Sequence, residues 1–456
     1  MNRYKFFREQ LHFITVVALA VVFIWTAFNS SKWRKNEVIR WDVYGYTMYL
    51  SSTLVYHDLK TLKHFDVIDQ KYHPCDERMD YARHDCGGGN RAFKYTCGNA
   101  LMMAPFYVTA HFLTVAFGTF PVDGYSEWYQ MSVVLSTIFW AVMGLLFLVL
   151  ILKRWLDPIS IAIAIICLGL GTNFFYYTTL ETGMTHLPSF FWFSFSCYCY
   201  LKWFESRSWK YALLTGFSFG FIALIRLTDM IYAIIPAVLF VTTFANSNTR
   251  QKTGLILQAS SAVLIAFLLF FIQMFYWRYV SGNWFHYSYT DEKFDFANPH
   301  VLAGLLSYKK GWLLYTPIMI FALAGILLLL KKNLQLGIGI LLFLILNVFV
   351  IFSWWMWWYG ASFGARSMIQ SYAVLGIPLA FVIHWIAEHV LSKNKKQHVA
   401  ATSLSILLFF FIALNLFQTY QYKRGVMHYE RMTKKSYWGI WGKLTLSGKE
   451  YGEYYE

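Results

Sequence analysis

Long apolar runs separated by short polar loops make up most of this chain. A helix needs about 20 consecutive apolar residues to cross a bilayer, and many of these runs approach that length. They occur at residues 11–28, 129–152, 157–174, 187–203, 211–228, 230–246, 254–276, 312–330, 334–353, 368–389 and 399–419. The pattern therefore predicts an all-α integral membrane protein with about eleven transmembrane helices.

Positive charge in the loops predicts the orientation, because Lys and Arg are retained on the cytoplasmic side. Alternate short loops carry Lys153/Arg154, Lys202/Arg207/Lys210, Arg250/Lys252, Lys331/Lys332 and Lys393/Lys395/Lys396. These loops fall on the side of the N-terminus, which we therefore place in the cytoplasm. The first apolar run follows Arg3, Lys5 and Arg8 and lacks a small-residue cleavage site, as is typical of a signal anchor.

This parity requires that the apolar stretch 100–120, which contains Pro105 and His111, does not fully cross. We expect it to lie in the outer interface or to re-enter. The composition agrees with a membrane protein: 57% of the residues are hydrophobic and 14% are charged, against roughly 25% charged in soluble domains. The net charge of +15 follows largely from the positive loops, so it does not indicate nucleic-acid binding.

The chain is predicted to form one polytopic domain, residues 1–420, with outer segments at 29–127 and 277–311. The first outer segment is expected to carry interfacial helices on the bilayer surface. A basic, aromatic tail, residues 421–456, follows the last span and by the same parity lies outside. Positive charge outside opposes the charge rule, so either the tail binds anionic headgroups or the number of spans is wrong by one.

Three cysteines, Cys75, Cys86 and Cys97, lie in the first outer segment. An oxidising compartment would allow one disulfide among them and leave one thiol. Zinc is a weaker alternative, because the spacing of His73, Cys75, His84 and Cys86 fits no standard site. The pairing of these cysteines is left open.

The predicted topology gathers the unusual ionisable residues on the outer side. They are Asp42, Glu181, Arg226, Asp229, Lys309, Lys310 and Arg366. Charges near the hydrocarbon region usually pair with each other or serve a site, so we expect a shared outer-facing cavity. The simpler alternatives are an exposed loop acid at Asp42, an intrahelical pair between Arg226 and Asp229, and headgroup contacts for the two lysines.

Arg366 ends the segment 354–366, which begins with a tryptophan cluster and continues through Gly360, Ala361, Gly364 and Ala365. The tryptophans alone could be an interfacial belt. A belt needs neither small residues nor a following Arg. Small residues let a ligand approach the backbone, and the planar fork of Arg suits phosphate oxygens.

With these residues assembled, the chain resembles the bacterial GT-C fold glycosyltransferases, which use polyprenyl-phosphate sugar donors and include protein O-mannosyltransferase-like enzymes and lipid A aminoarabinose transferases. The resemblance lies in the order of elements over residues 1–390. These elements are an Asp-x-Tyr-x-Tyr sequence (Asp42, Tyr44, Tyr46), the Glu-Thr-Gly-Met-Thr-His loop at 181–186, Arg-Leu-Thr-Asp at 226–229, the segment 311–317 and the segment 354–366.

The resemblance implies sugar transfer to a hydroxyl acceptor, a lipid, glycan or protein, at the periplasmic face of a bacterial inner membrane, with inversion. Asp42 would be the general base, and Glu181 would also belong to the catalytic residues. Arg366, followed by Arg226, Lys309 and Lys310, would bind the donor phosphate. His186, Tyr44, Tyr46 and Trp284 would bind substrate.

No cofactor is required by these residues. A divalent metal is compatible with them but unsupported, because Asp42 lacks the second carboxylate that many relatives carry beside it. Two other functions remain open. A transporter or flippase of a lipid-linked or anionic substrate would also carry charged residues in its spans, but near the midplane. An O-antigen ligase or polymerase would place its catalytic basic residues in a late outer loop.

Overall fold

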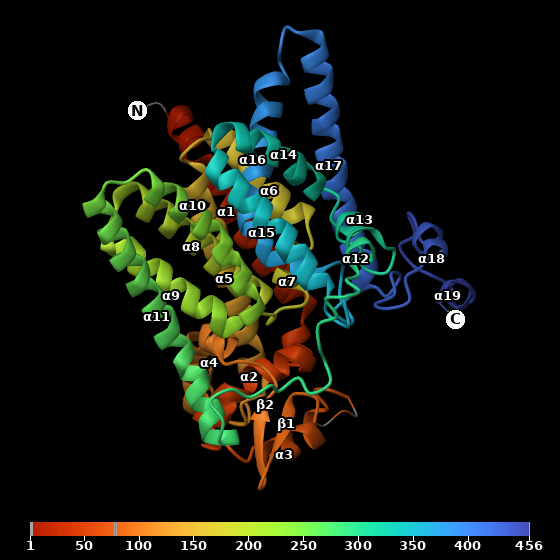
Figure 1. Cartoon of the computed structure of the whole chain (residues 1–456). Helices are drawn as coiled ribbons and strands as arrows, with labels where there is room; N and C mark the ends of the chain where they lie inside the picture. The colour runs from red at the N-terminus through yellow and green to blue at the C-terminus, as the bar shows by residue number, and fades with distance from the viewer. Residues whose placement is uncertain (1–2, 77, 79, 456) are drawn as a thin grey trace.

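The computed structural model describes residues 3–76, 78 and 80–455, and it is almost entirely helical (Figure 1). In chain order the elements are α1 (Arg3–Ser30), η1 (Lys32–Lys35), α2 (Trp41–Leu54), α3 (His64–Tyr72), β1 (Arg83–Gly87), β2 (Asn90–Phe93), α4 (Gly98–Phe117), α5 (Glu127–Leu152), α6 (Pro158–Gly171), α7 (Phe174–Thr179), α8 (His186–Ser206), α9 (Trp209–Ile225), η2 (Leu227–Ala233), α10 (Ile234–Ala245), α11 (Thr249–Ser281), α12 (Val301–Leu306), α13 (Trp312–Tyr315), α14 (Met319–Lys332), α15 (Leu334–Phe352), η3 (Arg366–Ser371), α16 (Tyr372–His389), α17 (Lys395–Lys423), α18 (Lys434–Gly439) and α19 (Gly448–Tyr455). The predicted class, an all-helical integral membrane protein, is confirmed.

Eight helices within the described residues are long and apolar enough to cross a membrane. They are Phe7–Lys35, Gly98–Phe117, Glu127–Leu152, Leu227–Ala245, Thr249–Ser281, Leu334–Phe352, Arg366–His389 and Lys395–Lys423. Seven of these correspond to predicted spans. The other four predicted spans match α6, α8, α9 and α14, which do not reach the same threshold, so the number eleven stays a prediction.

Several apolar runs are shorter than expected because the backbone leaves the helical conformation within or beside them. Asn173 separates α6 from α7, and Arg226 adopts an extended conformation (φ −152°) between α9 and η2. Pro317 separates α13 from α14. Non-helical backbone at membrane depth is tolerated where protein buries it or where it lines a water-filled space. The breaks therefore mark places where polar groups collect.

Helices α2 and α3 and the hairpin lie together in a layer at one end of the bundle (Figure 1). Strands β1 and β2 pair antiparallel, with Arg83 opposite Phe93. Arg83 is buried and its guanidinium contacts Asp69 at 2.6 Å and Asp66 at 3.0 Å. Tyr44, on the buried face of α2, donates a hydrogen bond to Asp69 at 2.7 Å, so this ion-pair cluster joins the hairpin to α2 and α3.

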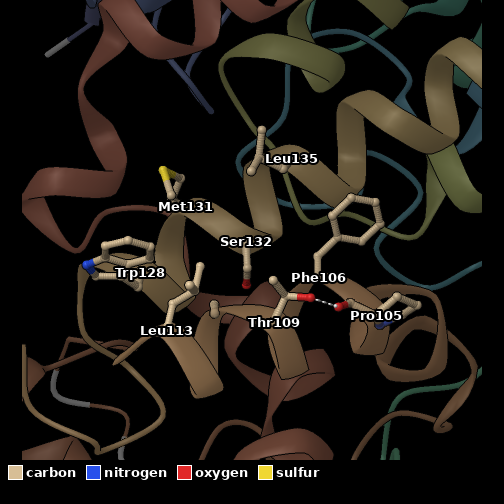
Figure 2. Close-up of a pocket in the computed structure, with 9 residues that line it drawn as sticks. Pro105, Phe106, Thr109, Leu113, Trp128, Met131, Ser132 and Leu135 are labelled. Carbon is tan, nitrogen blue, oxygen red and sulfur yellow. Dashed lines mark hydrogen bonds between the residues drawn. The ribbon is translucent and has the colours of Figure 1, made fainter. Parts of the chain in front are cut away.

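Helix α4 packs against the first half of α5, and an apolar groove of about 310 Å³ runs between them (Figure 2). The indole of Trp140 on α5 donates to the Met102 carbonyl on α4 at 2.9 Å. The groove is lined by Pro105, Phe106, Thr109, Ala110, Leu113, Trp128, Met131, Ser132 and Leu135. By length and composition α4 could span a membrane, so the expectation that residues 100–120 do not fully cross stays a prediction.

Candidate functional site

Asp42 lies in the first turn of α2, where the positive end of the helix dipole favours a carboxylate. Its Oδ1 accepts hydrogen bonds from the hydroxyls of Tyr81 (2.6 Å) and Tyr95 (2.7 Å). Its Oδ2 accepts a hydrogen bond from Nη2 of Arg366 at 2.8 Å. The Asp42 side chain is 14% exposed and the Arg366 side chain 16%, so the two charges neutralise each other in a largely desolvated place.

The environment of Asp42 favours the ionised carboxylate. Burial alone raises the pKa of Asp42, but the charge of Arg366 and the hydrogen bonds from Tyr81, Tyr95 and Arg366 outweigh burial and lower that pKa to about 2. Asp42 is therefore an anion at neutral pH, and its three donors fix its orientation.

Arg366 reaches Asp42 from the start of η3, directly after the small-residue segment. Gly364 there has φ +61°, and a Cβ on it would lie 3.0 Å from Cβ of Tyr315, so the turn that presents Arg366 depends on glycine. Nη1 of Arg366 also lies 3.7 Å from the sulfur of Met184. The loop at 181–186, α2 and the start of η3 thus meet at Arg366.

A second buried pair lies close to the first. Nε of Arg226 is 4.0 Å from Oδ1 of Asp229, so the two residues pair as the sequence allowed, although Arg226 precedes η2 in an extended conformation and the pair is not intrahelical. The pair extends further, because the amide of Gln370 donates to Asp229 at 3.1 Å. His186 contacts both Gln370 and Arg226. Its Nδ1 is 3.3 Å from Oε1 of Gln370 and 3.4 Å from Nη1 of Arg226.

Tyr46 packs against Tyr95, one of the residues that donate to Asp42. It is buried on α2, and its ring centroid is 4.5 Å from that of Tyr95. Burial and then the charge of Asp42 raise the pKa of Tyr46, whereas Arg366 and Arg226 oppose that rise. Asp42 and both cations therefore act electrostatically on the same phenol.

The two predicted lysines lie beside this cluster. Lys310 is 3% exposed and donates to the carbonyl of Ser362, four residues before Arg366. Burial and then the charge of Arg366 lower the pKa of Lys310 to about 7. Lys309 instead stacks its ammonium over the ring of Trp358, at 3.5 Å from the centroid. Lys310 is thus a buried amine that titrates near neutral pH.

Glu181 lies on another side of the cluster. Its Oε2 accepts a hydrogen bond from Tyr176 at 3.3 Å and is 3.6 Å from Nζ of Lys32. The Tyr176 ring contacts that of Tyr422 at 5.2 Å, and Lys310 lies over the same Tyr422 ring at 5.4 Å. The Glu181 side chain is 40% exposed.

Two predicted substrate-binding residues are not brought to this cluster. Tyr44 is 2% exposed and its hydroxyl is engaged by Asp69. Trp284 stacks on Phe271 of α11 at 5.4 Å and is 43% exposed. Neither side chain forms a hydrogen bond or an ion pair with Asp42 or Arg366, so neither belongs to the proposed site.

Sequence reasoning missed the residues that hold the predicted ones in place. Tyr81 and Tyr95 flank the hairpin and both donate to Asp42, and Gln370 joins His186 to Asp229. The chain has 32 tyrosines, so no local pattern distinguishes these two. Their role depends on the pairing of β1 with β2, which brings residues on both sides of the hairpin toward α2.

The three outer cysteines are each free, so the expected disulfide is not formed. Cys75 and Cys97 are buried, whereas Cys86 lies on β1 with its sulfur 3.6 Å from Nε2 of His286. Within the described part of the chain, no group of three or more His, Cys, Asp or Glu side chains is arranged to hold a metal ion.

No family model matches the chain, and no curated protein matches it. Structures of the Archaeoglobus fulgidus oligosaccharyltransferase are similar to it. The apo form has a TM-score of 0.49 at 14% identity, over 98% of this chain and 60% of that one. The form tethered to an acceptor peptide with an NVT sequon has a TM-score of 0.49 at 13% identity, over 99% and 59%. The complex with Zn and sulfate has a TM-score of 0.46 at 15% identity, over 97% and 56%. The chain thus spans about 60% of the length of the first of these structures.

Proposed function

We propose that this protein is a GT-C-like glycosyltransferase that moves a sugar from a polyprenyl-phosphate donor to a hydroxyl acceptor at the outer face of a bacterial plasma membrane. The observation that carries the proposal is the bond between Asp42 and Arg366. This bond joins a carboxylate of fixed orientation to a guanidinium, a group suited to phosphate binding. Arg226 and Lys310 belong to the same cluster. The motif order that resembles the GT-C enzymes supports the same assignment.

In the proposed reaction Arg366 binds the donor phosphate. A guanidinium can hold two oxygens of a phosphate in a planar fork, and the leaving phosphate gains negative charge as the glycosidic bond breaks. Arg226 and Lys310 add positive charge on neighbouring sides, and Lys309 contributes at the rim over Trp358. The prenyl chain would lie among the helices, where buried methylene groups supply binding energy.

Asp42 is proposed as the general base. The acceptor oxygen attacks the anomeric carbon and forms the new C–O bond, while its proton passes to Asp42 and the electron pair of the old C–O bond leaves with the phosphate. Attack opposite the phosphate inverts the anomeric centre. Oδ2 of Asp42 accepts its hydrogen bond from Nη2 of Arg366, and we propose that this donor turns to a phosphate oxygen when the sugar donor binds.

This exchange gives the pair a specific task. While Arg366 holds Asp42, the pKa of the carboxylate stays near 2 and the group is a weak base. When the phosphate becomes the partner of Arg366, the pKa of Asp42 rises and the acceptor hydroxyl can occupy the freed oxygen. Donor binding would therefore prepare the base, with Tyr46, His186 and Glu181 orienting the sugar or the acceptor.

The proposal is tested with purified protein in vesicles, supplied with polyprenyl-phosphate sugars and a mixture of hydroxyl acceptors. Released polyprenyl phosphate is measured for the wild type, for Asp42→Asn and for a control, Asp76→Asn. Asp76 is an acid of the same segment, but its side chain is 60% exposed and pairs with Arg40 instead of Arg366. We expect Asp42→Asn to lose activity and Asp76→Asn to retain it. Equal turnover by Asp42→Asn and the wild type would remove Asp42 as the base.

A further inference from the structure

The chain after the last span, residues 424–455, folds into a defined cap beside the end of α17. The side-chain amide of Gln421 donates to the carbonyls of Ile440 (2.8 Å) and Lys443 (2.9 Å). One turn earlier, the amide of Gln418 donates to the hydroxyl of Tyr437 at 2.9 Å. Buried amides with two carbonyl partners hold a segment firmly, so the cap keeps a fixed position relative to α17.

The cap lies at the end of the bundle that holds Asp42. Tyr422, in the last turn of α17, contacts Phe363 of the Arg366 segment at 5.5 Å between ring centroids. Trp438 of α18 donates to the hydroxyl of Tyr308 at 3.2 Å. In Figure 1, α18 and α19 extend sideways from α17, α12 and α13, away from the layer of α2, α3 and the hairpin. If a membrane surrounds the bundle, the cap lies beside the headgroup surface of that membrane.

Large aromatic and apolar side chains of the cap are exposed although it is tightly anchored. Trp438 is 53% exposed, Trp441 45% and Leu444 54%. The rings of Trp438 and Trp441 lie 5.4 Å apart, so they form one patch. Neighbouring aromatic side chains that face solvent would be unfavourable unless something covers them.

The cap, together with the last turn of α17, also carries uncompensated positive charge. Residues 421–456 contain seven Lys or Arg and four Glu. Lys443 pairs with Glu450 at 2.7 Å and Lys435 with Glu453 at 3.6 Å. Among the residues that the structure describes, Lys423, Arg424 and Lys434 have no carboxylate within ion-pair distance. The patch of two tryptophans is thus accompanied by free cations.

We propose that the cap, residues 424–455, docks on the anionic lipid headgroups of the leaflet on the Asp42 side. Trp favours the headgroup level of a bilayer because its ring is apolar and its N–H is polar. Basic residues near an anionic membrane surface add about 1 kcal/mol each. Helix α17 already fixes the cap at that surface, so docking costs little entropy. This surface is separate from the proposed glycosyl transfer and does not depend on it.

A fluorescent probe on the cap tests this docking. Leu444→Cys, made in a Cys86→Ser background to remove the half-buried native thiol, is labelled with the polarity-sensitive fluorophore NBD. The full-length protein is reconstituted in phosphatidylcholine vesicles with and without about one third phosphatidylglycerol. We expect blue-shifted, brighter emission in the anionic vesicles and a return toward the zwitterionic value at high salt, because salt screens surface charge.

Matched lysine variants separate charge recognition from general effects. Lys423→Gln with Lys434→Gln should lower the ratio of docked to undocked cap roughly tenfold to thirtyfold at low salt. Lys331→Gln with Lys332→Gln, which removes two charges at the opposite end of the bundle, should leave the emission unchanged. Equal emission in both vesicle types would overturn the proposal. Emission that instead shifts with protein concentration in detergent would identify a second copy as the occupant, which also overturns it.

Discussion

Asp42 and Arg366 stand 324 positions apart in the chain, yet a hydrogen bond of 2.8 Å joins them. Asp42 lies in the first turn of α2 and Arg366 begins η3, so the contact joins the layer of α2, α3 and the hairpin to the helix bundle. Each side chain is the counterion of the other in a largely desolvated place. Loss of either partner should therefore cost more than the pair itself contributes, because the remaining charge is left uncompensated.

A double-mutant cycle measures this dependence. Arg366→Met should lower the free energy of unfolding by roughly 3–5 kcal/mol, because Asp42 becomes a buried, unpaired anion. Adding Asp42→Asn should restore much of that loss, since the neutral amide needs no counterion. The unfolding midpoints of the four proteins in detergent check the cycle. Additive losses would mean that the two residues do not interact, contrary to the geometry.

Removal of one tyrosine should move the acid limb of the pH profile of kcat/KM, which reports the free enzyme. The hydroxyls of Tyr81 and Tyr95 help to lower the pKa of Asp42 to about 2. Without one of them the pKa rises, so Asp42 takes up its proton at a higher pH. We expect the acid limb of Tyr81→Phe to lie at higher pH than that of the wild type.

Tyr56→Phe is the control for this experiment. Its hydroxyl donates to the Asp123 carbonyl at 3.1 Å, outside the Asp42 cluster. The acid limb of this variant should coincide with that of the wild type. An unchanged limb in Tyr81→Phe would show that the group titrating there is not Asp42.

Deprotonation of Lys310 should produce the basic limb of the pH profile of kcat/KM. Burial and the charge of Arg366 lower the pKa of Lys310 to about 7, so its ammonium is present below that pH and is lost as the pH rises through it. If the ammonium binds the donor phosphate, kcat/KM for the donor should fall above about pH 7. Lys310→Arg should keep the charge and extend activity to higher pH, whereas Lys310→Met should be slow throughout. Coinciding basic limbs for the wild type and Lys310→Arg would exclude this role.

The sequence predicts that the charged residues lie on one side, but it does not predict which side chains bond to them. Positive charge in the loops predicts the orientation of the helices, and that orientation places Asp42 and Arg366 on the same side. The small residues before Arg366 mark this residue as unusual. The Asp-x-Tyr-x-Tyr motif that contains Asp42 also predicts that Tyr44 binds substrate. Tyr46, two residues later, packs against Tyr95 beside Asp42, whereas Tyr44 bonds to Asp69. Which face of α2 meets the site depends on packing against α3 and the hairpin, and α2 is buried on most sides, so no apolar stripe reveals it.

The helix breaks within the predicted spans are also not predictable from the sequence. Apolar content predicts where the chain is buried, but it does not reveal where a helix breaks. Arg226 and Asn173 lie at such breaks, and both belong to apolar runs that appear continuous. The breaks are stabilised by partners distant in the sequence. Asn173, for example, accepts a hydrogen bond from Tyr372 at 2.9 Å.

Gly183 sets the distance between α2 and the loop that carries Glu181 and Met184. Its φ is +91°, and a Cβ there would lie 2.4 Å from Cγ1 of Val43 and 2.8 Å from Cγ1 of Val133. Gly183→Ala therefore adds backbone strain and a clash with the residue after Asp42, and should cost roughly 3 kcal/mol or more. Because α2 must shift, the bond between Asp42 and Arg366 should weaken and activity should fall with stability.

Gly88→Ala is the matched control, because Gly88 also has positive φ (+62°) but no atom lies within 4 Å of the added Cβ. It should cost about 1 kcal/mol from strain alone and leave activity intact, since the hairpin turn lies away from Asp42. Unfolding midpoints and turnover of both variants give the comparison. Equal effects of the two substitutions would show that contact with Val43 does not position Asp42, and that the loop at 181–186 can move without disturbing the site.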